Sequence, residues 1–69
     1  MDIKWEEDVS IRVRAEHGEV LLSANRDGLV SLAGILLTLA EEGTGAHIHL
    51  DEHNSLEEGS CELILERVE

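Results

Sequence analysis

Four short stretches of the chain are typical of strands, and in three of them hydrophobic and polar residues alternate with the period of two that half-buried strands show. The first stretch is Val9–Ala15, and Glu19–Ala24 follows it after a turn at Glu16-His17-Gly18, where glycine allows positive φ. Ala46–Leu50 and Cys61–Glu66 repeat the pattern later in the chain. These four stretches are the predicted strands. The alternation in the last one directs the side chain of Cys61 into the core.

Between the second and third stretches, the sequence predicts one helix with an unusually wide apolar surface. Asn25 is the expected N-cap, the helix runs over Leu29–Ala40, and Gly43 is the expected terminator. An apolar stripe consists of Leu29, Leu32, Ala33, Leu36 and Ala40, and Val30, Ile35, Leu37 and Leu39 widen it around the cylinder.

A helix packed on one side of a sheet needs an apolar arc of only about 100°. We therefore predict a second copy against the excess apolar surface, with Gly34 allowing close approach. The predicted homodimer interface is Val30, Gly34, Leu37 and Thr38. The alternative is a helix tucked under a longer sheet.

The order strand-strand-helix-strand-strand predicts a single α+β domain over residues 1–69, with one antiparallel sheet of about four strands packed on the helix. The apolar run of the helix is too short for a membrane span, which needs about 20 residues. Cys61 is the only cysteine, so no disulfide forms within the chain. A lone thiol after a polar, acidic start favours the cytoplasm.

Charge narrows the range of partners. Sixteen Asp and Glu residues oppose five Lys and Arg residues, which gives a formal net charge of −11. Residues 51–69 hold seven of the acids and only one base, Arg67. Binding to phosphate backbones depends on clustered Lys and Arg, so we expect no nucleic acid and no anionic membrane as a partner. A basic protein is the expected partner, because opposite potentials accelerate association.

Three of the four histidines lie in the segment His47-Ile48-His49-Leu50-Asp51-Glu52-His53. On a strand, His47, His49 and Asp51 form one row, and His53 follows it. These four residues are the candidate ligands of a zinc ion. The competing interpretation is an exposed strand face, since two or three ligands without an enclosing shell seldom make a native site. No catalytic constellation accompanies them, so we expect neither an enzyme nor a cofactor.

The later part of the chain resembles a bacterial family of polymorphic-toxin immunity proteins, immunity protein 32. The resemblance covers residues 19–68. It is carried by Asn25-Arg26-Asp27-Gly28-Leu29, Leu32-Ala33, Leu36-Leu37-Thr38-Leu39-Ala40, Gly45-Ala46-His47-Ile48-His49-Leu50-Asp51 and Gly59-Ser60-Cys61-Glu62-Leu63-Ile64-Leu65-Glu66. It implies a protein that binds and neutralises a toxin encoded nearby, and it brings no catalytic residues.

The leading hypothesis is an immunity-type binding protein whose acidic surface docks on a basic toxin. The candidate contact residues are His47, His49, Asp51, Glu52, His53, Glu57 and Glu58. Two alternatives stay open: a small metal-binding protein or enzyme that uses the His47, His49 and Asp51 row, and a structural homo-oligomer without a specific ligand.

Overall fold

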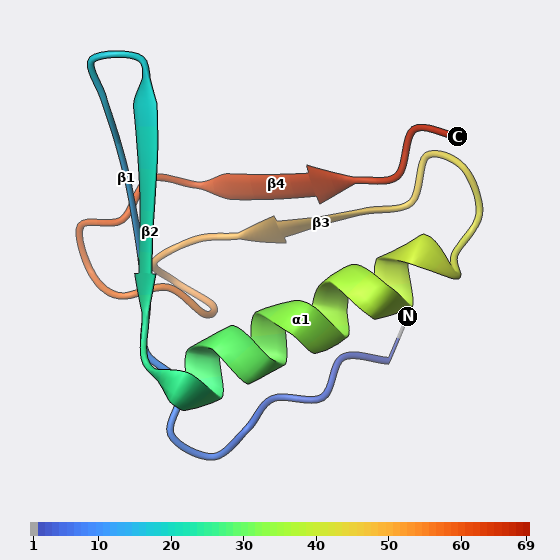
Figure 1. Cartoon of the computed structure of the whole chain (residues 1–69), viewed down its shortest axis with the longest axis horizontal. Coiled ribbons are helices and arrows are strands. Elements are labelled where there is room, and N and C mark those ends of the chain that lie inside the picture. Colours follow the sequence, from blue (N-terminus) through green and yellow to red (C-terminus); the bar gives the residue numbers. More distant parts are fainter. Residues whose placement is uncertain (1) are drawn as a thin grey trace.

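The computed structural model describes residues 2–69 and has five elements in the order β-β-α-β-β, as predicted. The strands are β1 (Ile11–Glu16), β2 (Glu19–Ala24), β3 (His47–Leu50) and β4 (Leu63–Glu66), and the helix is α1 (Arg26–Ala40). The β1–β2 hairpin crosses the β3–β4 hairpin at a steep angle, and α1 lies beside both (Figure 1). The chain is therefore an α+β fold.

The predicted single four-stranded sheet is wrong, because the strands form two separate antiparallel pairs, β1–β2 and β3–β4. The segment 57–61, which leads into β4, runs beside the outer edge of β1. The amide of Glu57 donates to the carbonyl of Ile11 at 2.8 Å, and that of Cys61 donates to Val13 at 3.0 Å. A turn at Gly59, whose φ is +86°, interrupts this pairing before a regular ladder forms.

Local chemistry explains the first hairpin. His17 and Gly18 form its two-residue loop, with φ values of +51° and +77°. Positive φ at both central positions defines the type I′ turn, whose twist matches that of the flanking strands. The predicted turn is confirmed, with His17 in a conformation that costs a non-glycine residue some energy.

The helix begins as predicted and ends differently. The side chain of Asn25 accepts a hydrogen bond from the amide of Gly28 at 2.8 Å, which confirms the N-cap. At the other end, the amides of Glu41 and Glu42 bond three residues back, and the guanidinium of Arg67 donates to the carbonyl of Glu42. Gly43 is not among the glycines with positive φ, so it is not the terminator. A residue near the C-terminus supplies the cap instead.

The core is small, and its buried apolar side chains come from β1, α1, β3 and the loop that follows β3. Its fully or nearly buried apolar residues are Ile11, Val13, Leu32, Ile35, Leu39, Leu50 and Leu56. Leu63 and Leu65 pack against it from β4, as the alternation predicted. Cys61 does not, because the turned segment 57–61 leaves its side chain exposed.

The buried face of α1 is rotated from the predicted stripe. Gly28, Ser31, Leu32, Ile35 and Leu39 are buried, and only Leu32 belongs to that stripe. Ser31 is buried because the N-terminal segment covers it, with the amide of Glu6 donating to its hydroxyl at 2.9 Å. The helix therefore turns its other, equally apolar side outward.

Candidate functional site

The outer face of the β3–β4 hairpin gathers the histidines and several acids. In the antiparallel register, His47 lies opposite Glu66 and His49 lies opposite Ile64. All four side chains are exposed, whereas their neighbours Ile48, Leu50, Leu63 and Leu65 face inward. The predicted exposed row on β3 is therefore present for His47 and His49.

Two contacts order the imidazoles on this face. Nδ1 of His49 lies 3.1 Å from Oε2 of Glu62, which precedes β4, and Nδ1 of His47 lies 3.0 Å from the carbonyl oxygen of Gly45. The two rings meet edge to face with centroids 5.2 Å apart. The contact between His49 and Glu62 lies at the surface, where such pairs contribute little stability.

The acids that follow β3 stabilise their own loop. The carboxylate of Asp51 accepts from the amide of His53 at 2.8 Å, and that of Glu52 accepts from the amide of Gly59 at 2.8 Å. Asn54 donates from its side chain to the carbonyl of His49 at 3.1 Å. Asp51 is half-buried by this arrangement, so it leaves the histidine row that the strand pattern assigned to it.

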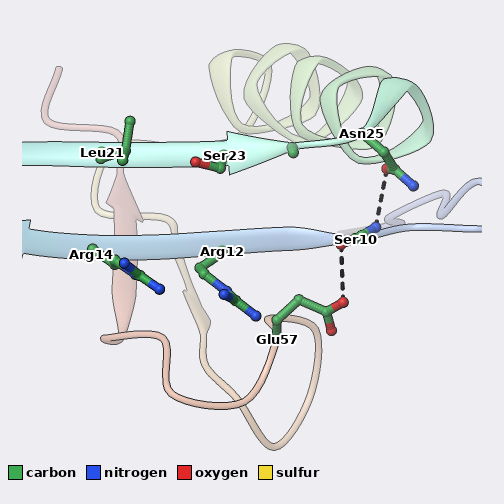
Figure 2. Close-up of a pocket in the computed structure, with 8 residues that line it drawn as sticks. Ser10, Arg12, Arg14, Leu21, Ser23, Asn25 and Glu57 are labelled. Carbon is green, nitrogen blue, oxygen red and sulfur yellow. Dashed lines mark hydrogen bonds between the residues drawn. The ribbon is translucent and has the colours of Figure 1, made fainter.

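Glu57 and Glu58 make no hydrogen bond or ion pair with the histidines among residues 2–69. The carboxylate of Glu57 accepts from the hydroxyl of Ser10 at 3.0 Å, on the outer face of the β1–β2 hairpin (Figure 2). Together with Arg12 and Arg14 it lines a hollow of about 460 Å³. Glu58 is exposed. The structure thus divides the seven candidate contact residues between a strand face, a loop and the border of a second hairpin.

The geometry offers little to a metal ion. Across residues 2–69, no three or more His, Cys, Asp or Glu side chains come together as a metal-binding group. Within the proposed ligand set of His47, His49, Asp51 and His53, only the first two present their rings to each other, and the Asp51 carboxylate is bonded to backbone. Two imidazoles on an open strand lack the third ligand that zinc sites have.

Three residues of this face were missing from the candidate list. Ile64 is 53% exposed and lies opposite His49, with Glu62 before it, next to the start of β4, and Glu66 after it at the end of β4. The alternation of β4 already placed all three outward. The missing information was the register with β3, which brings them beside His47 and His49. We refer to these five residues as the β3–β4 face.

Carboxylates dominate the remaining surface. None of the acids at positions 2–69 is buried, and Arg26 is the only Lys or Arg among these residues with a side-chain carboxylate oxygen of Asp or Glu within 4.0 Å. Those partners are Glu6 and Asp27. The negative charge is thus left largely uncompensated by neighbouring cations, so it produces an extended negative potential.

The sequence model of the family described as Immunity protein 32 matches residues 19–68. The chain belongs to this family of immunity proteins, whose function is to neutralise a cognate toxin. Immunity proteins are typically not enzymes, in agreement with the expectation from the sequence. No curated protein sequence and no solved structure gives a significant match.

The matched segment begins at β2, so β1 lies outside it. Ile11 and Val13 of β1 are nevertheless almost completely buried. The folded unit is therefore larger than the matched segment. Over residues 2–69, no helix has both the length and the apolar character that crossing a membrane requires.

Proposed function

We propose that the chain neutralises a basic toxin by docking its acidic surface on it, with the β3–β4 face at the centre of contact. The observation that carries this proposal is the exposed Ile64 surrounded by His47, His49, Glu62 and Glu66. Interfaces commonly place an apolar anchor at the centre and a polar rim around it, which excludes water. The adjoining loop contributes Asp51, Glu52, His53 and Glu58, and Glu57 extends the acidic border.

The surrounding charge supports a basic partner. A net charge of −11 on a small domain attracts a cationic protein over distances comparable to the Debye length, about 8–10 Å at physiological salt. A toxin that acts on nucleic acid is basic where it holds its substrate. Docking there would occlude the toxin and block its activity.

The test uses the cognate toxin domain. Ile64→Ser should weaken binding at least tenfold, and co-expression of the variant should no longer protect cells from the toxin. Val68→Ser is the matched control, because Val68 is also an exposed apolar residue but lies beyond the end of β4. Equal affinities for wild type and the Ile64→Ser variant would refute the β3–β4 face as the contact centre.

Electrostatics is tested separately. Glu58→Lys should slow association most strongly at low salt, because rim charges act on the association rate and are screened by ions. The same reversal at Glu57 also removes its bond to Ser10, so the comparison of the two variants separates charge from loop structure. An association rate that does not depend on salt would contradict charge steering.

We also propose that two copies associate through α1. Its outward face carries Leu29, Val30, Leu36 and Leu37, each at least 42% exposed, with Ala33, Gly34 and Ala40 between them. No charged side chain occurs from Gly28 to Ala40. A Cβ added at Gly34 would have no neighbour within 4 Å, which leaves room for an approaching helix.

The predicted interface residues Val30, Gly34 and Leu37 lie on this face, and Thr38 lies at its border, half-buried. Sedimentation equilibrium should show a dimer at micromolar concentration. Leu37→Glu should give monomers, whereas Val68→Glu adds the same charge at a similarly exposed site and should leave the dimer intact. A wild-type monomer at those concentrations would refute this interface.

A further inference from the structure

The free edge of β2 is open to another strand. The amide of Asn25 donates to the carbonyl of Ser10 at 3.0 Å, and this bond sets the alternation of the β1–β2 ladder. Bonded pairs alternate with non-bonded pairs, so the N–H and C=O groups of Val20, Leu22 and Ala24 point away from β1. No hydrogen bond among residues 2–69 engages these outward groups. They form a row of unpaired backbone donors and acceptors.

The opposite edge of the hairpin, on β1, has outward backbone groups that are paired. The outward carbonyls of Ile11 and Val13 on β1 accept from segment 57–61, and the amide of Val13 donates to the hydroxyl of Ser60 at 3.2 Å. The chain thus pairs one edge of the hairpin and leaves the other unpaired. Native proteins protect free edges with Lys, Pro, a bulge or a covering loop.

β2 has none of these protections. Its six residues, Glu19 to Ala24, contain no Lys or Pro, and the register with β1 is continuous, without a bulge. Val20 and Leu21 are 68% and 61% exposed. By contrast, β3 and β4 have four residues each, and Asn54 bonds the carbonyl of His49. The free edge of β2 is therefore the longest unpaired strand edge in the described structure.

A hollow on the face of the same hairpin offers a place for side chains. Arg12 and Arg14 of β1 lie next to Leu21 and Ser23 of β2 in its wall, with Glu57 at one end (Figure 2). Within residues 2–69 neither arginine has a carboxylate oxygen within 4.0 Å. Two guanidinium groups on one strand face bind carboxylates well, because their planar forks match the two oxygens.

We propose that β2 receives an extended strand of the toxin, which adds to the β1–β2 sheet and places a Glu or Asp side chain in the hollow. Main-chain hydrogen bonds supply affinity in this kind of recognition, and pockets for alternate side chains supply specificity. The carboxylate would meet Arg12 and Arg14, and Leu21 would pack on its aliphatic stem. This inference rests on the proposed function, because the occupant is the toxin.

Charge decides between a toxin strand and the other possible occupants. A second copy of this chain also carries −11, and the β2 edge begins with the acid Glu19, unlike the uncharged outward face of α1. Like charge therefore opposes pairing of two β2 edges, whereas a basic toxin is attracted. Free phosphate or another small anion would meet the same repulsive field, and the hollow provides side chains rather than a cradle of backbone amides. A carboxylate held on a docked strand is retained by the rest of the interface.

The first experiment removes one outward donor. Val20→Pro deletes an N–H that points away from β1, so the ladder of the hairpin stays complete; proline is tolerated on strand edges for this reason. Val20→Thr keeps the N–H and is the matched control. Val20→Pro should bind the cognate toxin domain at least tenfold more weakly, and Val20→Thr should bind it like wild type. Circular dichroism checks that both variants fold.

The outcomes separate this inference from the proposed function. Wild-type protein that does not bind the toxin overturns both. Binding by the wild type that survives Val20→Pro overturns the strand addition alone. Loss of self-association in Val20→Pro with intact toxin binding would assign the edge to a second copy and also overturn the inference. In the complex, slower hydrogen exchange at the amides of Val20 and Leu22 is the expected direct evidence.

A second pair of variants tests the hollow. Arg14→Gln should weaken toxin binding several-fold even though it makes the chain more negative. Arg26→Gln makes the same change in charge at a residue outside the hollow and should not weaken binding. If both variants bind alike, the carboxylate does not occupy the hollow. Binding of inorganic phosphate to the free protein at millimolar concentration, lost in Arg14→Gln, would instead identify a free-anion site and overturn the assignment to a strand.

Discussion

Gly28→Ala should destabilise the protein although alanine is the better helix former. A Cβ at position 28 would lie 2.7 Å from the carbonyl oxygen of Ser10 and 2.9 Å from Cγ1 of Ile11, both closer than real contacts allow. The first neighbour is backbone, and it is held in place because the same carbonyl accepts from the amide of Asn25. Ile11 is completely buried and has no space to retreat.

The magnitude follows from two opposing effects. Overpacking of a well-packed site costs about 1–3 kcal/mol, and replacing a helical glycine with alanine returns roughly 0.5–1 kcal/mol. The net loss is about 1 kcal/mol, which corresponds to a fall in Tm of about 4–8 °C for a domain of this size. Urea unfolding followed by circular dichroism measures it, with an expected fall in the midpoint of roughly 1 M.

Gly34→Ala is the control, because its new Cβ would have no neighbour within 4 Å. At concentrations where the chain is monomeric, this variant should be more stable than wild type by roughly 0.5–1 kcal/mol. A Gly28→Ala variant that gained as much stability as Gly34→Ala would refute the close contact of α1 with Ser10 and Ile11.

Three further predictions concern the cap and the histidines. Asn25→Ala should cost about 1–2 kcal/mol in urea unfolding, because Asn25 caps Gly28 and also bonds Ser10; an unchanged midpoint would show that water replaces these bonds. Replacement of both His47 and His49 by Gln should weaken toxin binding measured by surface plasmon resonance, because both rings flank Ile64 on the β3–β4 face; an unchanged affinity would exclude them from the contact. Zinc titration calorimetry should give no dissociation constant below high micromolar, since the face provides only two imidazoles.

Local rules accounted for most of the secondary structure. The period of two located β1, β3 and β4, the turn at His17 and Gly18 located β2, and the cap chemistry of Asn25 placed the start of α1. These features depend on residues close together in the chain. The exposed positions of His47 and His49 followed from the same alternation.

The errors arose from contacts between distant residues. The buried side of α1 depends on Glu6 reaching Ser31, which no helical periodicity reveals. The end of the helix depends on Arg67, and the exposure of Cys61 depends on the turn at Gly59. Likewise, Ile64 became a candidate contact only when the register with β3 was known.

The pairing of segment 57–61 with β1 has a consequence for the timing of protection in the cell. β1 is made first, but its outer edge finds partners only after residue 61 has been synthesised. Closing so long a loop carries a high entropic cost, and folds dominated by such distant contacts form more slowly than those built from local ones. A chain released before residue 61 therefore leaves the outer edge of β1 unpaired. We expect the toxin-neutralising form to appear only after segment 57–61 has left the ribosome, which sets the earliest moment of protection during synthesis.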